Sequence, residues 1–155
     1  MRIVTRMCIA LLLSLGFAYA DTVKVVYDLT TGDSKKIEKH LINSLDAVAK
    51  YYKKEQKELK VMVVISGNAY KYFINDLKAS PYKKDQDAIE AQEKFRHRLQ
   101  NLNDNFGVTF NMCSVGMKTR NIDKNTLYKF VHAELMKSVY LIDAQNNGYA
   151  YMPIH

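Results

Sequence analysis

The sharpest chemical signal in the sequence is a cysteine, Cys113, at the end of a β-rich run over 108–112. A turn over 114–121 follows it, so the thiol should meet unpaired backbone N–H groups and the positive end of a helix dipole. Both favour the thiolate over the thiol. Lys118 adds positive charge if the turn folds back. We therefore predict that Cys113 is the reactive residue, with Ser114 and Lys118 beside it.

The alternative is that Cys113 is an inert core residue, because free cysteines are often buried as small hydrophobes. Asn111 and Met112 precede it and suggest a strand that leaves the core, which favours exposure of the thiol. Position alone does not decide between the two interpretations.

Other candidate loops follow the remaining strands, where ligands meet open α/β sheets. Gly67 and Asn68 end one apolar strand, and their backbone N–H groups could bind an anion at a helix start. A tight strand-to-helix turn needs the same glycine, so this signal is weak. His132 lies at another strand end and is a candidate base for Cys113. Its simpler interpretation, a polar residue at a strand end, is favoured.

Several function classes are excluded by missing patterns. The sequence holds no phosphate-binding or dinucleotide-binding glycine loop and no hydrolase nucleophile elbow. Its four histidines have no spacing typical of metal ligands, so we expect neither a metal nor another cofactor. The lysines are scattered among acidic residues and do not cluster with aromatic ones, so we expect no nucleic-acid partner.

The first 20 residues have the pattern of a secretory signal peptide. Arg2 and Arg6 precede an apolar run over 8–17, and 18–20 read Ala-Tyr-Ala. A helix of ten residues spans roughly 15 Å, about half of a hydrocarbon core, so we expect no stable membrane anchor. No cysteine follows the small residues, which excludes a lipoprotein signal. The pattern predicts cleavage after Ala20 and a periplasmic domain over 21–155.

Cleavage at this point would change the cysteine chemistry of the protein. It removes Cys8 and leaves Cys113 without a partner for an internal disulfide. It also lowers the formal net charge from +7 to +5, because two arginines and no acid are lost. The remaining length suits one domain.

Hydrophobic periodicity predicts an α/β domain. Apolar residues at steps of three and four indicate long helices over 37–52, with Asp33 or Ser34 as the cap, and over 88–106. The unbroken apolar run 61–65 predicts a strand covered on both faces. Further strands are expected at 23–28, 108–112, 128–133 and 149–152, the last ended by Pro153, and further helices at 69–77, 114–121 and 134–147. The order predicts a largely parallel five-stranded sheet with helices on both faces.

Four segments in this order resemble the DsrE/DsrF-like family, which includes sulfur-relay proteins. They are the first strand at 25–28, the strand and glycine at 63–67, the Gly-Val strand ending in cysteine at 106–113, and the closing helix and strand at 145–151. The resemblance implies a flavodoxin-like sheet and assembly into trimers or hexamers. It also implies that Cys113 accepts sulfane sulfur as a persulfide and passes it to a partner.

These inferences predict an exported sulfur carrier rather than a classical enzyme. Cys113 would hold the persulfide, the turn after it would stabilise the anion, and Gly67 and Asn68 would line the pocket. Its partners would be a sulfur donor and a sulfur acceptor. The export signal departs from the cytoplasmic relay members and excludes tRNA thiolation. Two alternatives stay open: a non-catalytic oligomeric module that binds a small ligand or a protein and in which Cys113 is structural, and a thiol enzyme that uses Cys113 and His132.

Overall fold

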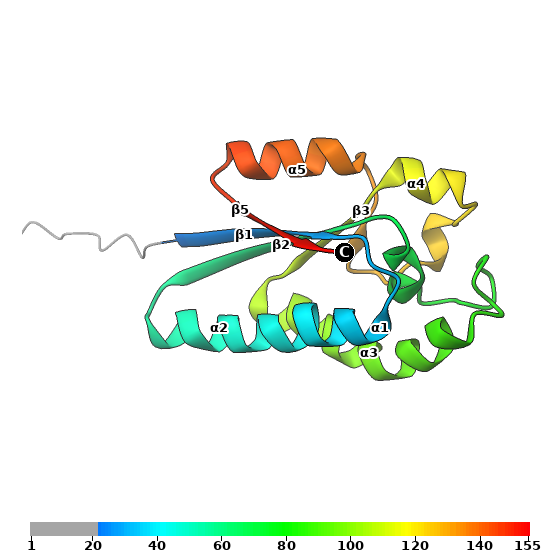
Figure 1. Cartoon of the computed structure of the whole chain (residues 1–155), viewed down its shortest axis with the longest axis horizontal. Helices are drawn as coiled ribbons and strands as arrows, with labels where there is room; N and C mark the ends of the chain where they lie inside the picture. The colour runs from blue at the N-terminus through cyan, green and yellow to red at the C-terminus, as the bar shows by residue number, and fades with distance from the viewer. Residues whose placement is uncertain (1–21) are drawn as a thin grey trace, which may run out of the picture.

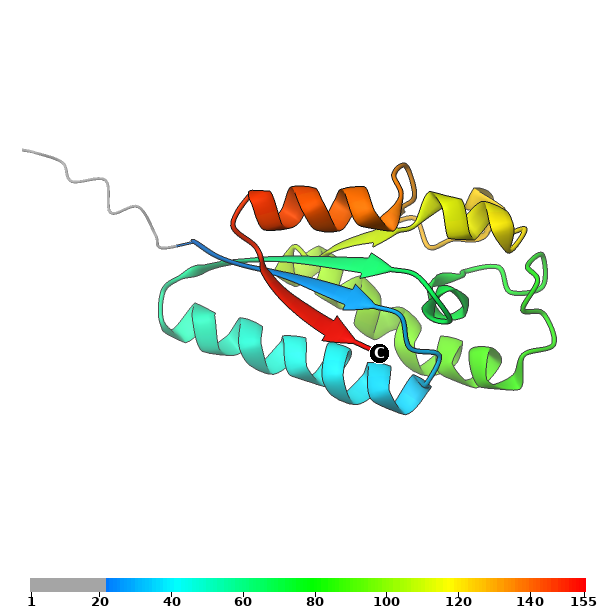
Figure 2. The ribbon, with the colours of Figure 1, turned by 45° about the horizontal axis from the view of Figure 1, so that its top comes forward.

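Five parallel strands form the sheet, in the spatial order β4-β3-β2-β1-β5 (Figures 1 and 2). The computed structural model describes residues 22–155, so the predicted signal peptide lies outside the described residues. The strands are β1 (Thr22–Leu29), β2 (Glu58–Ile65), β3 (Thr109–Met112), β4 (Val131–His132) and β5 (Ala150–Ile154). Because all five run the same way, their carboxyl ends share one edge of the sheet.

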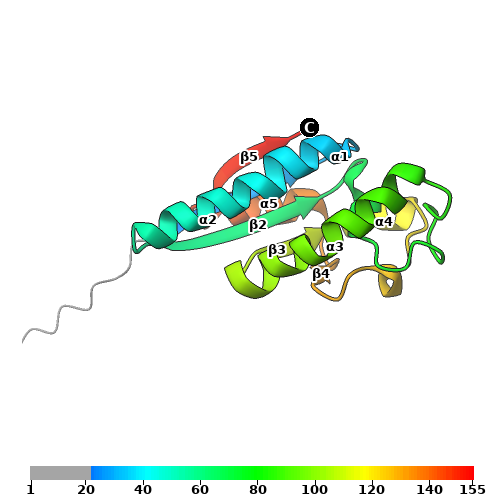
Figure 3. The same ribbon diagram turned by 90° about the horizontal axis from the view of Figure 1, so that it is seen from below.

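Helices cover both faces of the sheet, so the predicted α/β fold is confirmed. Below it in Figure 1 lie α1 (Ser34–Lys36), η1 (Ile37–Asn43), α2 (Ser44–Lys54) and α3 (Gln86–Phe106), and Figure 3 shows α2 and α3 side by side. Above it lies α5 (Lys137–Asn146), with α4 (Ser114–Thr119) on the same side beyond the strand ends. Two 3₁₀ turns, η2 (Ala69–Phe73) and η3 (Lys124–Thr126), complete the carboxyl edge.

The first helical segment begins where the sequence predicts. The Asp33 side chain accepts hydrogen bonds from the backbone N–H groups of Lys35 and Lys36, at 2.9 and 3.1 Å, which caps the first turn. The segment then runs without a break from α1 to α2, but its middle part, η1, has π-type hydrogen bonding, which the periodicity does not reveal.

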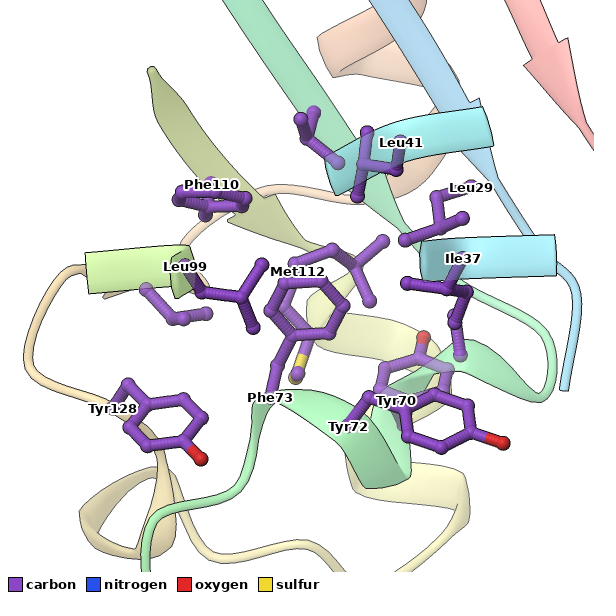
Figure 4. Close-up of a cluster of buried hydrophobic side chains, with 14 of the residues drawn as sticks. Leu29, Ile37, Leu41, Tyr70, Tyr72, Phe73, Leu99, Phe110, Met112 and Tyr128 are labelled. Carbon is purple, nitrogen blue, oxygen red and sulfur yellow. The ribbon is translucent and has the colours of Figure 1, made fainter. Parts of the chain in front are cut away.

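The two faces of the sheet carry cores of very different size. The larger one packs against α2 and α3 and is rich in aromatic side chains, among them Tyr70, Phe73 and Phe110 (Figure 4). The smaller one, under α5, consists of Val26, Val64, Tyr140 and Ala144 with partly buried neighbours. β2 contributes to both cores, which explains its unbroken apolar run and confirms that it is covered on both faces.

Two element boundaries differ from the prediction because of tertiary hydrogen bonds. The fourth strand has two residues rather than the six of 128–133, because the segment before it turns away to η2: Leu127 bridges Ile74, and the Tyr128 N–H donates to the Phe73 carbonyl. The last long helix begins at Lys137 and not at residue 134. The Tyr140 hydroxyl accepts the N–H groups of residues 134 and 135, at 3.2 Å each, and holds them outside the helix.

Two further elements, the last strand and the segment after β2, also differ from the prediction. Pro153 does not end the last strand but lies within β5, which is possible because β5 is an edge strand and can spare one N–H donor. The expected helix over 69–77 is the shorter 3₁₀ turn η2. Across residues 22–155, none of the helices is long and apolar enough to cross a membrane.

Candidate functional site

The loops after β1 and β2 pack tightly together at the carboxyl edge of the sheet. Gly67 has a φ of 62°, and a Cβ there would lie 2.7 Å from the Thr30 carbonyl oxygen. The Asn68 N–H donates to that same carbonyl at 2.9 Å. Gly67 is therefore fixed by both its backbone conformation and this close approach. The loop that the sequence analysis proposed as an anion site thus has a clear structural role in joining β1 to β2.

Cys113 lies at the end of β3, where its backbone N–H donates to the Ile65 carbonyl of β2 at 2.9 Å. It is the residue that precedes α4, as predicted. The expectation that the strand leaves the core before it is wrong, because Asn111, Met112 and Cys113 are all buried. The chain after β4 accounts for this: the Leu135 carbonyl accepts the Ser114 N–H at 3.0 Å and holds that segment over the strand end.

The surroundings of the Cys113 sulfur favour its ionised form. Burial raises the pKa of the thiol, but hydrogen bonds to the sulfur act in the opposite direction and outweigh it, so that the pKa is lowered. The pKa is lowered by the backbone N–H groups of Gly116, Lys137 and Val115 and by the nearby Tyr70 hydroxyl, whose own hydrogen bond goes to the Cys113 carbonyl. The first turn of α4 and the start of α5 thus converge on one sulfur atom. A buried thiol whose pKa is lowered by several backbone N–H groups differs from an inert core cysteine.

Tyr70 is the side chain that sequence reasoning did not single out. It belongs to η2, is 1% exposed, and its hydroxyl donates to the Cys113 carbonyl at 3.0 Å. Burial and the hydrogen bond to Cys113 raise the pKa of Tyr70 well above its usual value, so the hydroxyl stays protonated and remains a donor. The Arg120 guanidinium lies 5.0 Å from the ring centroid. The sequence feature that could have indicated Tyr70 is its position, two residues after the Gly67–Asn68 turn.

Gly116 allows Tyr70 to reach this position. A Cβ built on Gly116 would lie 2.1 Å from the Tyr70 hydroxyl oxygen and 2.9 Å from its Cζ. No side chain fits there while the tyrosine keeps its place. The lack of a side chain at Gly116 therefore sets how closely α4 approaches η2, and with it the position of the donors around Cys113.

The other predicted site residues lie further from the thiol. Ser114 adjoins Cys113 and uses its N–H to bind Leu135, whereas Lys118 is exposed on α4. His132 is exposed on β4 and is paired with Asn111, two residues before Cys113. The groups that lower the pKa of the Cys113 thiol are therefore backbone N–H groups and Tyr70, rather than Lys118 or His132. Gly67 and Asn68 connect to the site through Tyr70.

Exposed apolar side chains flank the buried cysteine. Val115 on α4 and Leu135 and Met136 just before α5 are each more than two-fifths exposed. All three belong to the segments that supply N–H groups to Cys113 or bind its neighbour Ser114. Large apolar side chains that lie exposed on neighbouring segments are typical of contact surfaces.

A separate apolar groove lies on the α2 face of the sheet. It has a volume of about 390 Å³, and its lining includes Val23, Tyr27, Val48, Tyr51 and Met152. The groove contains the exposed edge of β5 and one exposed tyrosine of α2. In the part of the chain that the structure describes, no three histidine, cysteine or acidic side chains come together in a way that would hold a metal ion.

A family model and one solved structure agree with this fold. A model of the DsrE/DsrF-like family matches residues 24–154. The structure of MTH1491 from Methanobacterium thermoautotrophicum, a protein of unknown function, has a TM-score of 0.63 to this chain at 18% identity, and the match covers 84% of this chain and 98% of MTH1491. The ychN protein from E. coli has a TM-score of 0.48 at 14% identity, with the same coverage of both chains. No curated protein sequence matches significantly.

Proposed function

The chain belongs to the DsrE/DsrF-like family, and from this premise we propose that it is a sulfur carrier whose sulfur is held on Cys113. The observation that supports the proposal most directly is the set of donors around the thiol. Three backbone N–H groups lower the pKa of a thiol that burial alone would raise, and the Tyr70 hydroxyl binds the carbonyl of the same residue. An inert core cysteine needs no such donors.

The chemistry requires no cofactor. The Cys113 thiolate attacks the outer sulfur of a sulfane donor R–S–SH. The S–S bond of the donor breaks, R–S⁻ leaves and takes up a proton, and Cys113 becomes Cys–S–SH. In the second half, a thiolate of the acceptor attacks the outer sulfur, and the Cys113 thiolate is the leaving group. Low-pKa thiolates leave faster, so the donors that activate Cys113 as a nucleophile also release it from the persulfide.

The apolar side chains beside the thiol suit transfer between proteins. Val115, Leu135 and Met136 give a donor or acceptor protein apolar surface to cover at the point where its own thiol must meet Cys113. Burial of the reacting sulfur atoms under this cover would keep water from the persulfide during transfer. The partners in this proposal are therefore a sulfur donor and a sulfur acceptor protein.

Export and self-assembly are also parts of the proposal. Secretion to the periplasm is supported by the signal-peptide pattern, which consists of Arg2 and Arg6, the apolar run 8–17 and the small residues before Asp21. Family resemblance supports a homo-oligomer, a trimer or hexamer. Exposed Tyr151 and Met152 on the edge strand β5 offer apolar surface for it.

Sulfur loading tests the proposal. The mature protein is incubated with a polysulfide, excess reagent is removed, and the intact mass is measured. We expect the mass to increase by one sulfur atom and dithiothreitol to remove this added mass. A Cys113→Ser variant should show no increase. An unmodified Cys113 that still reacts as a free thiol on unfolding would contradict the proposal.

The groove on the α2 face favours a second candidate, a binding module in which Cys113 is structural. Its lining is largely apolar and includes exposed Tyr51 and Met152, which suits an apolar small molecule or a protein segment. In that case Cys113→Ser would retain binding, and thiol reagents would react only after unfolding. A Tyr51→Ser variant would lose the ligand while leaving the unfolding free energy close to that of wild type, because Tyr51 is 58% exposed.

A further inference from the structure

A buried carboxylate, Asp28, lies at the carboxyl end of β1 on the α5 face of the sheet. Its side chain is 4% exposed. One oxygen lies 2.8 Å from the Lys137 Nζ, and the other accepts a hydrogen bond from the Tyr151 hydroxyl at 2.9 Å. A charge so fully removed from water is costly unless it is paired, so Lys137 is essential to its accommodation.

Lys137 connects this carboxylate to the thiol. It is the first residue of α5, its ammonium group lies 2.8 Å from an Asp28 oxygen, and its backbone N–H contributes to the lowered pKa of the Cys113 thiol. Two residues before it, the Leu135 carbonyl accepts the Ser114 N–H at 3.0 Å, which holds the start of α5 over the strand end that carries Cys113. The residue before Lys137 provides no side-chain cap for the helix. The start of α5 is therefore tied down on β1 by an ion pair rather than by a local capping bond.

We propose that Asp28 is a positioning residue for Cys113: by anchoring Lys137, it holds the first N–H of α5 against the thiolate. The inference deepens the proposed function, since it concerns the same sulfur atom, but it is tested by ionisation rather than by sulfur transfer. A residue on β1 thereby tunes a residue two strands away in the sheet.

Other charged and titratable side chains lie beside Cys113 and the Asp28–Lys137 ion pair. Tyr70 from η2 binds the Cys113 carbonyl, with Arg120, the residue after α4, over its ring, and Tyr151 from β5 binds Asp28. Burial, together with the hydrogen bond to Asp28, raises the pKa of Tyr151, and burial and Cys113 raise that of Tyr70. Both tyrosines therefore stay protonated over the range in which the thiol titrates.

The test is the pH profile of Cys113 alkylation by iodoacetamide in the folded protein, followed by intact mass. In Asp28→Asn, the carboxamide keeps the shape of the side chain but no longer holds the ammonium. We expect the profile to move to higher pH and the rate near neutral pH to fall by about 3-fold to 10-fold, because a hydrogen bond to a charged group is weakened. A purely structural effect on folding would leave the midpoint unchanged.

Two further variants keep the test decisive. Lys137→Gln retains the backbone N–H and removes the ammonium, so it should move the profile in the same direction. The double variant, Asp28→Asn with Lys137→Gln, leaves no unpaired buried charge. It should shift the pH profile no further than either single change, because both changes break the same ion pair. Lys50→Gln is the matched control, since it breaks an exposed 2.7 Å pair with Asp46 on α2. It should leave the profile unchanged.

The proposal is overturned if the midpoint of a cooperatively folded Asp28→Asn protein stays or moves to lower pH. A lower midpoint would mean that the freed Lys137 acts directly on the thiolate. If the single variant does not fold, the double variant decides by the same criterion. Sulfur loading distinguishes this failure from that of the proposed function, because wild-type protein that takes up no sulfur can still show the Asp28 effect.

Discussion

Replacing Gly116 with alanine is a stringent test of the geometry around Cys113, because the site and helix propensity predict opposite signs. In an ordinary helical position the change stabilises a protein by about 0.4–1 kcal/mol. Here the new Cβ would lie 2.1 Å from the Tyr70 hydroxyl oxygen, whereas an ordinary contact begins near 3.4 Å. One of the two groups must therefore move by more than an ångström.

The expected magnitude follows from what that movement disturbs. Tyr70 is 1% exposed, so its ring can move away from the new Cβ only by displacing buried neighbours. Overpacking of this kind costs about 1–3 kcal/mol, and loss of the 3.0 Å bond from Tyr70 to the Cys113 carbonyl adds about 1 kcal/mol. The gain in helix propensity offsets roughly 1 kcal/mol of this. The net loss is about 1–3 kcal/mol, equivalent to roughly 3–10 °C in Tm.

Urea and thermal unfolding followed by circular dichroism measure this effect. Lys118→Ala, an exposed change in the same helix, should stay within about 0.5 kcal/mol of wild type. Adding Tyr70→Phe to Gly116→Ala removes the clashing oxygen, so the two changes together should cost at least about 0.5 kcal/mol less than their sum. A Gly116→Ala protein as stable as wild type, or more stable, would refute the account of how α4 and η2 meet.

Three other predictions concern the same edge of the sheet. Gly67→Ala should lower the free energy of unfolding in urea by about 2–4 kcal/mol, because it adds a 2.7 Å contact to a backbone with positive φ. Gly148→Ala is the control: its φ is 81° but its Cβ would meet open space, so it should cost less. Equal losses would contradict the role of the close approach at Gly67. The pKa of Cys113 is lower in the folded protein than the ordinary thiol value of 9.0. Ionisation of Cys113 therefore stabilises the fold fully above pH 9.0, and this stabilisation is lost as pH falls through the folded pKa. The advantage of wild type over Cys113→Ser in unfolding free energy should therefore grow as pH is raised from neutral towards about 9, and an advantage independent of pH would refute the lowered pKa. His132→Ala should leave the alkylation profile of Cys113 unchanged, and a shifted profile would restore His132 as its base.

The architecture was predictable because it depends on patterns that are local in the sequence. The run 61–65 is apolar without interruption because both faces of β2 are covered, and the helical stripes follow from burial of one face. The boundaries near β4 and α5 were not predictable. They depend on the Tyr140 hydroxyl, which binds N–H groups five and six residues before it, and on Leu127 bridging Ile74.

The candidate site was predictable only in part. Cys113 and the turn after it follow from residue type and position. The donors of Gly116 and Lys137 are backbone groups, which carry no signature in side-chain chemistry, and Lys137 lies 24 residues beyond the cysteine. The pairing of Asp28 with Lys137 is equally hidden, since it joins the first strand to the last long helix.

The central claim is that folding turns Cys113 into a reactive thiolate, and the pH profile of its alkylation tests this directly. The rate is measured by intact mass in the folded protein and again in urea, with the Cys113→Ser variant as a blank. We expect the folded profile to have its midpoint below the ordinary thiol value of 9.0 and the unfolded profile to return to it. A folded protein whose Cys113 shows the unfolded midpoint, or reacts only after unfolding, would contradict the claim.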